Sequence, residues 1–80
     1  MSSLPDLENP KFLVPKSFKS YELTGVIRRR LVLDPSDSLF LLINGKKLLK
    51  SSQTLGDVYR KNADKDGFLY IVYTNEVISG

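Results

Sequence analysis

The longest apolar pattern in the chain is the run Gly-Phe-Leu-Tyr-Ile-Val-Tyr at positions 67–73. It follows the turn-forming residues Asp64-Lys65-Asp66 and precedes Thr74-Asn75. A strand with one solvated face alternates apolar and polar residues, whereas an uninterrupted run of aromatic and β-branched residues is typical of a strand buried on both faces. We therefore expect 67–73 to form a central, parallel-type strand with neighbours on both sides.

Two other apolar runs predict further strands. Leu39-Phe40-Leu41-Leu42-Ile43 ends at Asn44-Gly45, the strongest two-residue hairpin signal, so 46–50 should return antiparallel. Lys11-Phe12-Leu13-Val14-Pro15 lies between Pro10 and Pro15. Proline donates no ladder hydrogen bond and occurs at strand starts and edges, so 11–15 is predicted to be a short, exposed edge strand.

Helical spacing predicts one main helix. Its apolar residues fall at i, i+3, i+4 and i+8, at Leu23, Val26, Ile27 and Leu31. Ser20 is the candidate N-cap and Glu22 suits the first turn. Arg30 borders the apolar stripe, where its stem can cover the core or its guanidinium can meet an anionic group. From spacing alone, the first alternative is the simpler.

A second, shorter helix is predicted after a cap at 52–54. Its apolar positions are Leu55, Val58 and Tyr59. Residues 62–67 form a turn; Asp64-Lys65-Asp66-Gly67 resembles the start of a calcium loop, but the Glu that would complete such a loop is absent. Residues 1–10 show no periodicity and are an extended lead-in. The element order indicates an α+β sheet with one main helix packed across it.

Composition restricts the function more than the fold. The 80 residues suffice for one domain, and 41% hydrophobic with 26% charged residues is ordinary for a globular protein. The chain has no Cys and no His, which removes disulfides, thiolate metal sites, thiol nucleophiles and the usual general base. We expect no enzyme, no metal site and no cofactor. The absence of a membrane-spanning run or signal peptide leads us to expect a cytosolic protein.

The net charge of +3 is less informative than where the basic residues gather. They form short clusters at Lys16 and Lys19, Arg28-Arg29-Arg30, Lys46-Lys47 with Lys50, and Arg60-Lys61. Such clusters suit nucleic acid or an anionic membrane surface, but short charge runs are more often solvated faces. Nucleic acid is therefore the least favoured partner.

Four stretches together resemble the autophagy ubiquitin-like modifiers, the family of microtubule-associated protein light chain 3 and its GABA-receptor-associated relatives, most closely the light-chain-3 branch. They keep the family's order and spacing and are Lys11-Phe12-Leu13-Val14-Pro15, Val26-Ile27-Arg28-Arg29-Arg30-Leu31, Phe40-Leu41-Leu42-Ile43-Asn44-Gly45, and Asp66-Gly67-Phe68-Leu69-Tyr70 with Val72-Tyr73. The resemblance implies a ubiquitin-like β-grasp over 11–73 and a flexible conjugation tail over 74–80.

The resemblance also implies a function. Members of this family are joined through a C-terminal Gly, here Gly80, to phosphatidylethanolamine on autophagosome membranes by conjugation enzymes, after a protease has exposed that Gly where needed. They recruit receptors and adaptors that carry a short aromatic-x-x-aliphatic motif, and microtubules are a further implied partner. Ser79 stands where the family usually has an aromatic residue.

The implied motif-binding residues form an edge strand and two pockets. Lys11, Leu13 and Phe68 would border the pocket for the aromatic anchor. The pocket for the aliphatic anchor would be formed by Phe12, Val14, Pro15, Leu23, Val26 and Arg30. In this setting Arg30 becomes a partner for acidic residues that flank the motif. A peptide added to an exposed strand edge gains main-chain hydrogen bonds, and its side chains enter the pockets.

Compared with the family, the sequence lacks both N-terminal helices and the first strand, which lies between the 11–15 strand and the C-terminal strand. We therefore expect a shortened form, in which backbone groups on both strands lose a partner. Residues 11–15 could move across to pair with 68–73, or another chain could supply the strand. The alternative function is thus an interaction module that is not conjugated or that binds motifs weakly.

Overall fold

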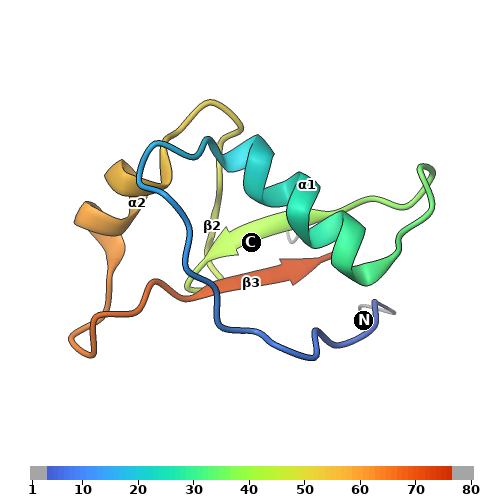
Figure 1. Cartoon of the computed structure of the whole chain (residues 1–80), viewed down its shortest axis with the longest axis horizontal. Coiled ribbons are helices and arrows are strands. Elements are labelled where there is room, and N and C mark those ends of the chain that lie inside the picture. The colour runs from blue at the N-terminus through green and yellow to red at the C-terminus, as the bar shows by residue number, and fades with distance from the viewer. Residues whose placement is uncertain (1–3, 77–80) are drawn as a thin grey trace.

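Three short strands form one antiparallel sheet in the order β2-β1-β3 in the computed structural model, which describes residues 4–76. β1 spans Phe40–Ile43, β2 Lys47–Leu48 and β3 Ile71–Thr74. β1 lies in the middle, pairing Ile43 with Lys47 of β2 and with Ile71 of β3. Figure 1 shows β3 along one edge of this sheet. The predicted α+β class is confirmed.

The hairpin between β1 and β2 follows its sequence signal. Asn44 and Gly45 have φ angles of 53° and 73°, and the Lys46 N–H donates to the Ile43 carbonyl over 2.9 Å. Positive φ at both central residues is the type I′ geometry that suits the twist of two paired strands. The returning strand is shorter than the predicted 46–50, because after the Leu49 N–H bonds to the Leu41 carbonyl the chain turns away towards the second helix.

The main helix, α1, spans Ser20–Leu31. Its N-cap is Lys19, one residue before the predicted cap Ser20. The Glu22 carboxylate accepts the Lys19 N–H over 2.9 Å, whereas the buried Ser20 hydroxyl donates to the Gln53 carbonyl. The predicted cap was wrong because this hydroxyl joins α1 to a distant loop and does not close the helix end.

α1 ends in a left-handed residue, Val32, whose φ is 53°. The N–H groups of Val32 and Leu33 donate to the carbonyls of Arg29 and Arg28, an arrangement that satisfies the last helical carbonyls. The Arg28 guanidinium then donates to the Asp34 and Asp37 carbonyls, at 2.8 Å each. Part of the basic run at 28–30 therefore closes the loop after α1.

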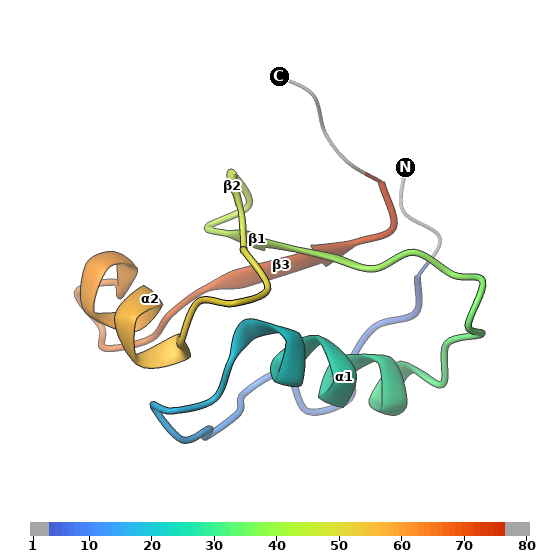
Figure 2. The same ribbon diagram turned by 90° about the horizontal axis from the view of Figure 1, so that it is seen from above.

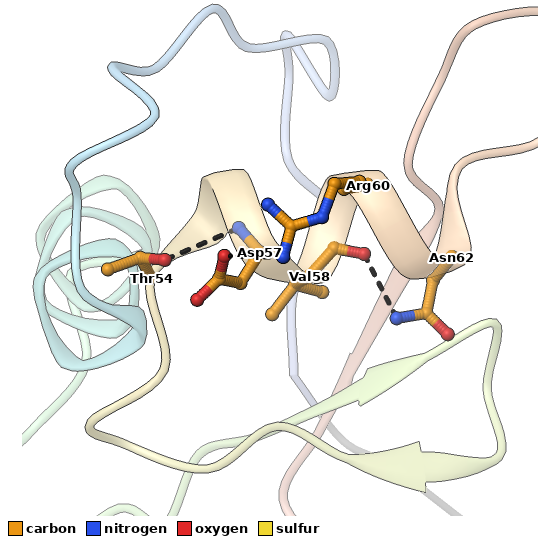
Figure 3. Close-up of polar contacts among 5 residues, drawn as sticks. All are labelled: Thr54, Asp57, Val58, Arg60 and Asn62. Carbon is orange, nitrogen blue, oxygen red and sulfur yellow. Dashed lines mark hydrogen bonds and ion pairs between the residues drawn. The ribbon is translucent and has the colours of Figure 1, made fainter.

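The second helix, α2, spans Leu55–Asn62 and begins as predicted. The Thr54 hydroxyl accepts the Asp57 N–H over 3.3 Å, and the Asn62 side chain donates to the Val58 carbonyl over 2.9 Å (Figure 3). Leu55 and Val58 are buried, but Tyr59 is 44% exposed. The Tyr59 hydroxyl instead donates to the Gly67 carbonyl and so fastens α2 to the turn before β3.

In Figure 2 α1 lies across one face of the sheet and α2 lies beside one end of the strands, and side chains from both helices and β1 form the core. Val58, the most buried large side chain, is 1% exposed. The buried core residues are Leu23, Ile27, Leu31, Leu41, Ile43, Leu49, Leu55 and Val58. Val26, at the border of the α1 stripe, is half-buried. Among the described residues, no helix combines the length and hydropathy that a membrane span requires.

The final strand differs from the prediction in position, direction and burial. β3 starts at Ile71, pairs antiparallel with β1 and lies at the edge of the sheet. Phe68, Tyr70 and Val72 are 45–49% exposed, whereas the residues between them point towards the helices. The continuous apolar run thus has one packed and one bare face, because within residues 4–76 α1 covers one face of the sheet and no helix covers the other.

The predicted edge strand at 11–15 is absent. Residues 11–15 pair with no strand among the described residues, and a turn follows in which the Phe18 N–H donates to the Pro15 carbonyl. Phe12 and Val14 pack on the core, whereas Leu13 is fully exposed. The suggested pairing of 11–15 with 68–73 is also absent. The side chains alternate as in a strand, but no neighbouring backbone is present to form a ladder.

The described part of the lead-in, residues 4–10, contains no helix or strand and lies near β3. The Tyr73 hydroxyl accepts the Leu7 N–H over 3.1 Å and donates to the Pro5 carbonyl over 2.6 Å. β3 includes Thr74, the first residue of the predicted tail. The rest of that tail from position 77, including Gly80, and positions 1–3 lie outside the described residues.

Two helical glycines should respond differently to alanine. A Cβ at Gly25 would lie 3.5 Å from the Arg29 side chain, so Gly25→Ala is expected to raise the free energy of unfolding by about 0.5–1 kcal/mol. A Cβ at Gly56 would lie 3.0 Å from both the Cβ and the carbonyl oxygen of Lys16, which is tighter than an ordinary contact. Gly56→Ala should give no gain in urea unfolding. Equal stabilisation by both substitutions would contradict this packing.

Candidate functional site

A cavity of about 540 Å³ lies between the segment 10–16, the two helices and the residues around β3. We call it the groove. Its lining consists of apolar or uncharged residues except for Lys11 and Lys16; the lining residues are Leu7, Pro10, Lys11, Phe12, Leu13, Val14, Pro15, Lys16, Leu23, Ile27, Leu55, Gly56, Tyr59, Phe68, Leu69, Tyr70, Ile71 and Tyr73. Its volume falls within the range of ordinary ligand pockets.

The segment 11–15 is held by the packing of two side chains and by hydrogen bonds just after its last residue. Phe12 and Val14 turn towards the core, and the Gly56 N–H donates to the Lys16 carbonyl over 2.9 Å. The Leu55 N–H also donates to the Phe18 carbonyl over 2.8 Å. The start of α2 therefore fixes the chain just after the segment, while the backbone of 11–14 forms no hydrogen bond within the described residues.

Phe68 stands opposite Lys11 at the border of the groove. The Lys11 ammonium lies 5.5 Å from the centroid of the Phe68 ring, within the range of a cation–π interaction. Phe68 is positioned by the turn before it: Gly67 has a φ of 87°, and the Phe68 N–H donates to the Asp66 carboxylate over 2.9 Å. The predicted turn at 62–67 is present but shorter, since α2 includes Asn62 and the Gly67 N–H donates to the Asp64 carbonyl, and it places an aromatic ring beside a cation.

Asp66 and Tyr70 form an exposed acid–phenol pair next to Phe68. The Tyr70 hydroxyl donates to the Asp66 carboxylate. This bond, followed by the Phe68 N–H, holds the pKa of Asp66 below its ordinary value. The same bond raises the pKa of Tyr70, because the phenol must give up that hydrogen bond when it ionises. The pair therefore keeps a negative charge at this end of the turn.

Arg30 lies outside the groove. Its guanidinium carbon lies 4.6 Å from the centroid of the Phe12 ring, and the side chain borders a second cavity of about 540 Å³ with Leu31 and residues 5–9 of the lead-in. Arg30 is exposed, and its guanidinium lies over Phe12, which packs on the core, so this position agrees with the simpler sequence interpretation of a stem over apolar surface. Its contact with the Phe12 ring links the basic run to a groove-lining residue.

The structure brings together most, but not all, of the residues that the resemblance implied. Those that line the groove are Lys11, Phe12, Leu13, Val14, Pro15, Leu23 and Phe68. Val26 and Arg30 do not line it, and Gly80 lies outside the described residues. The two expected pockets merge into one continuous cavity, since residues of both sets line it.

The sequence interpretation missed the other lining residues, which are Leu7, Pro10, Lys16, Ile27, Leu55, Gly56, Tyr59, Leu69, Tyr70, Ile71 and Tyr73. Ile71 and Tyr73 could have been found from the period of two, had 67–73 been interpreted as a strand with one packed face. Gly56 carried no recognisable signal, because its role depends on close approach to Lys16. Within residues 4–76 no three acidic side chains gather in a group that could hold a metal.

The chain is similar to autophagy proteins over its whole length. The family model described as "Autophagy protein Atg8 ubiquitin like" matches residues 1–80. The chain is 40% identical over 78 residues to protein lgg-2 of Caenorhabditis elegans, 38% over 77 residues to human microtubule-associated protein 1 light chain 3 gamma, and 35% over 75 residues to autophagy-related protein 8 of Candida glabrata. These alignments cover 98%, 96% and 94% of this chain, but 60%, 52% and 63% of the relatives.

Proposed function

Because the chain belongs to the Atg8 ubiquitin-like family of autophagy proteins, we propose that it acts as a ubiquitin-like modifier that binds short peptide motifs of autophagy receptors and adaptors. It spans between about half and two thirds of the length of the relatives it matches, so every partner named here is part of the proposal. The role is recognition, and the chain itself catalyses no reaction.

The observation that carries this proposal is the apolar groove beside an unpaired backbone. Residues 11–14 have an extended, alternating arrangement, with Phe12 and Val14 inward and Lys11 and Leu13 outward. Their N–H and C=O groups form no hydrogen bond within the described residues. A peptide strand could take these bonds while its aromatic and aliphatic side chains enter the groove next to Phe68 and Leu23.

The charges near the groove favour a motif with acidic flanks. Lys11 and Lys16 line the groove, and Arg30 lies over the ring of Phe12. A carboxylate next to any of these cations would be attracted, and at such exposed positions the attraction should weaken with salt. The apolar anchors should therefore supply most of the affinity, and the flanking charges a smaller part.

Titration with a motif peptide tests this function. We expect binding of an aromatic-x-x-aliphatic peptide to weaken by about tenfold or more when Leu13 or Phe68 is replaced by Ala, because each loses an apolar side chain worth about 1.5–3 kcal/mol when fully buried. Both residues are exposed, so the fold should survive. Leu48→Ala on β2 is the matched control. Equal affinity for all variants in calorimetric titrations would refute motif binding in the groove.

The proposal extends to conjugation and location. Conjugation enzymes would join Gly80 to phosphatidylethanolamine, so that a cytoplasmic protein becomes attached to the autophagosome membrane. A processing protease acts before this step wherever residues follow Gly80. Microtubules are a further proposed partner, because the name of the human relative includes microtubule association.

One observation favours a second candidate, an interaction module that is not conjugated or binds motifs weakly. Residues 11–15 lack the ladder that would hold them as a strand, so a peptide would have to order them as it binds. Nucleic-acid binding has less support, because the Arg28 side chain is engaged by the loop after α1 and Arg30 by Phe12.

A further inference from the structure

The turn at 64–68 lies between α2 and β3 and carries Phe68 to the border of the groove (Figure 1). Its backbone hydrogen bonds lie within the turn itself. The Gly67 N–H donates to the Asp64 carbonyl over 2.9 Å, and the Asp64 N–H donates to the Phe68 carbonyl over 2.8 Å. These bonds fix the shape of the turn, but they do not fix where the turn stands relative to the groove.

Two phenol hydroxyls bond to this turn, one from the helix before it and one from the residues after it. The Tyr59 hydroxyl of α2 donates to the Gly67 carbonyl over 2.6 Å, and the Tyr70 hydroxyl donates to the Asp66 carboxylate. The other oxygen of this carboxylate accepts the Phe68 N–H over 2.9 Å. Asp66 therefore joins the Tyr70 hydroxyl to the backbone of Phe68.

The rings of both tyrosines belong to the groove. Tyr59 and Tyr70 line it, yet both are exposed, so burial does little to fix their positions. The centroid of the Tyr70 ring lies 6.2 Å from that of Phe68, within the range of aromatic pairs. Phe68 also contacts the Lys11 ammonium. The two hydroxyl bonds, the ring pair and the cation thus all act on the position of one side chain, Phe68.

We propose that the hydroxyls of Tyr59 and Tyr70 are positioning groups of the motif site, which hold Phe68 at the border of the groove before a peptide binds. This inference rests on the motif binding proposed above and adds two residues to those that the resemblance implied. A side chain that already has its bound position loses less conformational freedom on binding, so the affinity rises without any new contact with the peptide. Removal of either hydroxyl should leave the tyrosine ring in the groove and release Phe68.

Tyr59→Phe and Tyr70→Phe test this in the 80-residue chain, because each removes one oxygen and keeps the ring. In the free chain, the Phe68 ring should shift the NMR signals of the Lys11 methylene group next to the ammonium, and Phe68→Ala gives their unshifted position. We expect both tyrosine variants to move these signals towards that position. Tyr21→Phe is the matched control, since Tyr21 is exposed on α1 and does not line the groove. It should leave the signals unchanged.

NMR titration, which also measures weak binding, gives the affinity for a synthetic peptide with tryptophan and leucine as the two anchors and glutamates before them. Tyr59→Phe and Tyr70→Phe should each bind this peptide about two- to tenfold more weakly, the range that one hydrogen bond supports. In chains that also carry Phe68→Ala, the same substitutions should have no further effect, because the side chain on which they act has been removed.

Three results would overturn the inference. Unchanged Lys11 signals in both tyrosine variants would mean that the hydroxyls do not hold Phe68. Affinities equal to that of the Tyr21→Phe control would mean that the position of Phe68 does not affect binding. The same loss of affinity with and without the Phe68 ring would mean that the hydroxyls contact the peptide directly. If the unsubstituted chain binds no peptide, the proposed function fails, and the Lys11 signals still decide whether the hydroxyls position Phe68.

Discussion

Replacing Leu41 by Ala is expected to lower the free energy of unfolding by about 2–5 kcal/mol, the usual range for a buried leucine. Leu41 belongs to the central strand β1, and its side chain is 3% exposed in the core between the sheet and the helices. A domain of this size is expected to have about 4–12 kcal/mol of stability in total. The substitution should therefore remove a large part of it, and in a thin two-layer core there is little neighbouring packing to compensate.

Leu48→Ala provides the matched control for that substitution. Leu48 of β2 pairs with Leu42, the residue after Leu41, and is 47% exposed on the face of the sheet that no helix covers. Its truncation should therefore lower the free energy of unfolding by less than about 1 kcal/mol. Urea unfolding followed by circular dichroism measures both variants. A similar loss at Leu41 and Leu48 would show that the core does not lie where the structure places it.

The local elements were predictable because their signals are contained in short stretches. The α1 stripe, the Thr54 cap and the Asn44-Gly45 turn each act over a few residues, and each appears within about one residue of its predicted place. The cap of α1 was displaced by one residue for a long-range reason: the Ser20 hydroxyl bonds to Gln53, which nothing in the local sequence could show.

The strand neighbours were not predictable, since they depend on what lies alongside each strand. An apolar run such as 67–73 indicates that its side chains favour burial, but it does not indicate whether other elements pack on one face of the strand or on both. In the structure, β3 has one covered face and one free edge, so Phe68, Tyr70 and Val72 remain exposed. Residues 11–15 have the composition of a strand, and without a neighbour they keep its alternation but not its ladder.

The groove is lined by residues of both segments whose neighbours were predicted wrongly, residues 11–15 and the residues around β3. Its inner walls come from α1, α2 and the residues around β3. The inward position of Leu23 follows from the helical period, whereas Phe68 was expected at the groove only because the family resemblance implied it. Ile71 was missed because the run was interpreted as buried on both sides. Residues 11–14 form no backbone hydrogen bond within the described part of the chain, and the proposed motif binding depends on these free groups.

If Gly80 is the point of attachment proposed above, replacing it should have a large effect on conjugation. Gly80→Ala is expected to abolish conjugation to phosphatidylethanolamine. The carboxyl group of Gly80 would be passed from an enzyme thiol to the lipid amine, which requires the end of the chain to enter a narrow channel. Glycine fits because it has no Cβ and adopts backbone conformations closed to other residues. Alanine would obstruct the approach at the reacting carbon, while the fold over 11–73 should be unaffected.

Conjugation reconstituted with the enzymes of the family and liposomes that contain phosphatidylethanolamine would measure this loss by the mass added to the chain. Ser79→Ala is the control, because it changes the neighbouring side chain and leaves Gly80 in place. The control should be conjugated at close to the rate of the unmodified sequence, since a small residue replaces another. Normal lipid addition to the Gly80→Ala chain would rule out Gly80 as the point of attachment and would leave the non-conjugated module as the better description of its function.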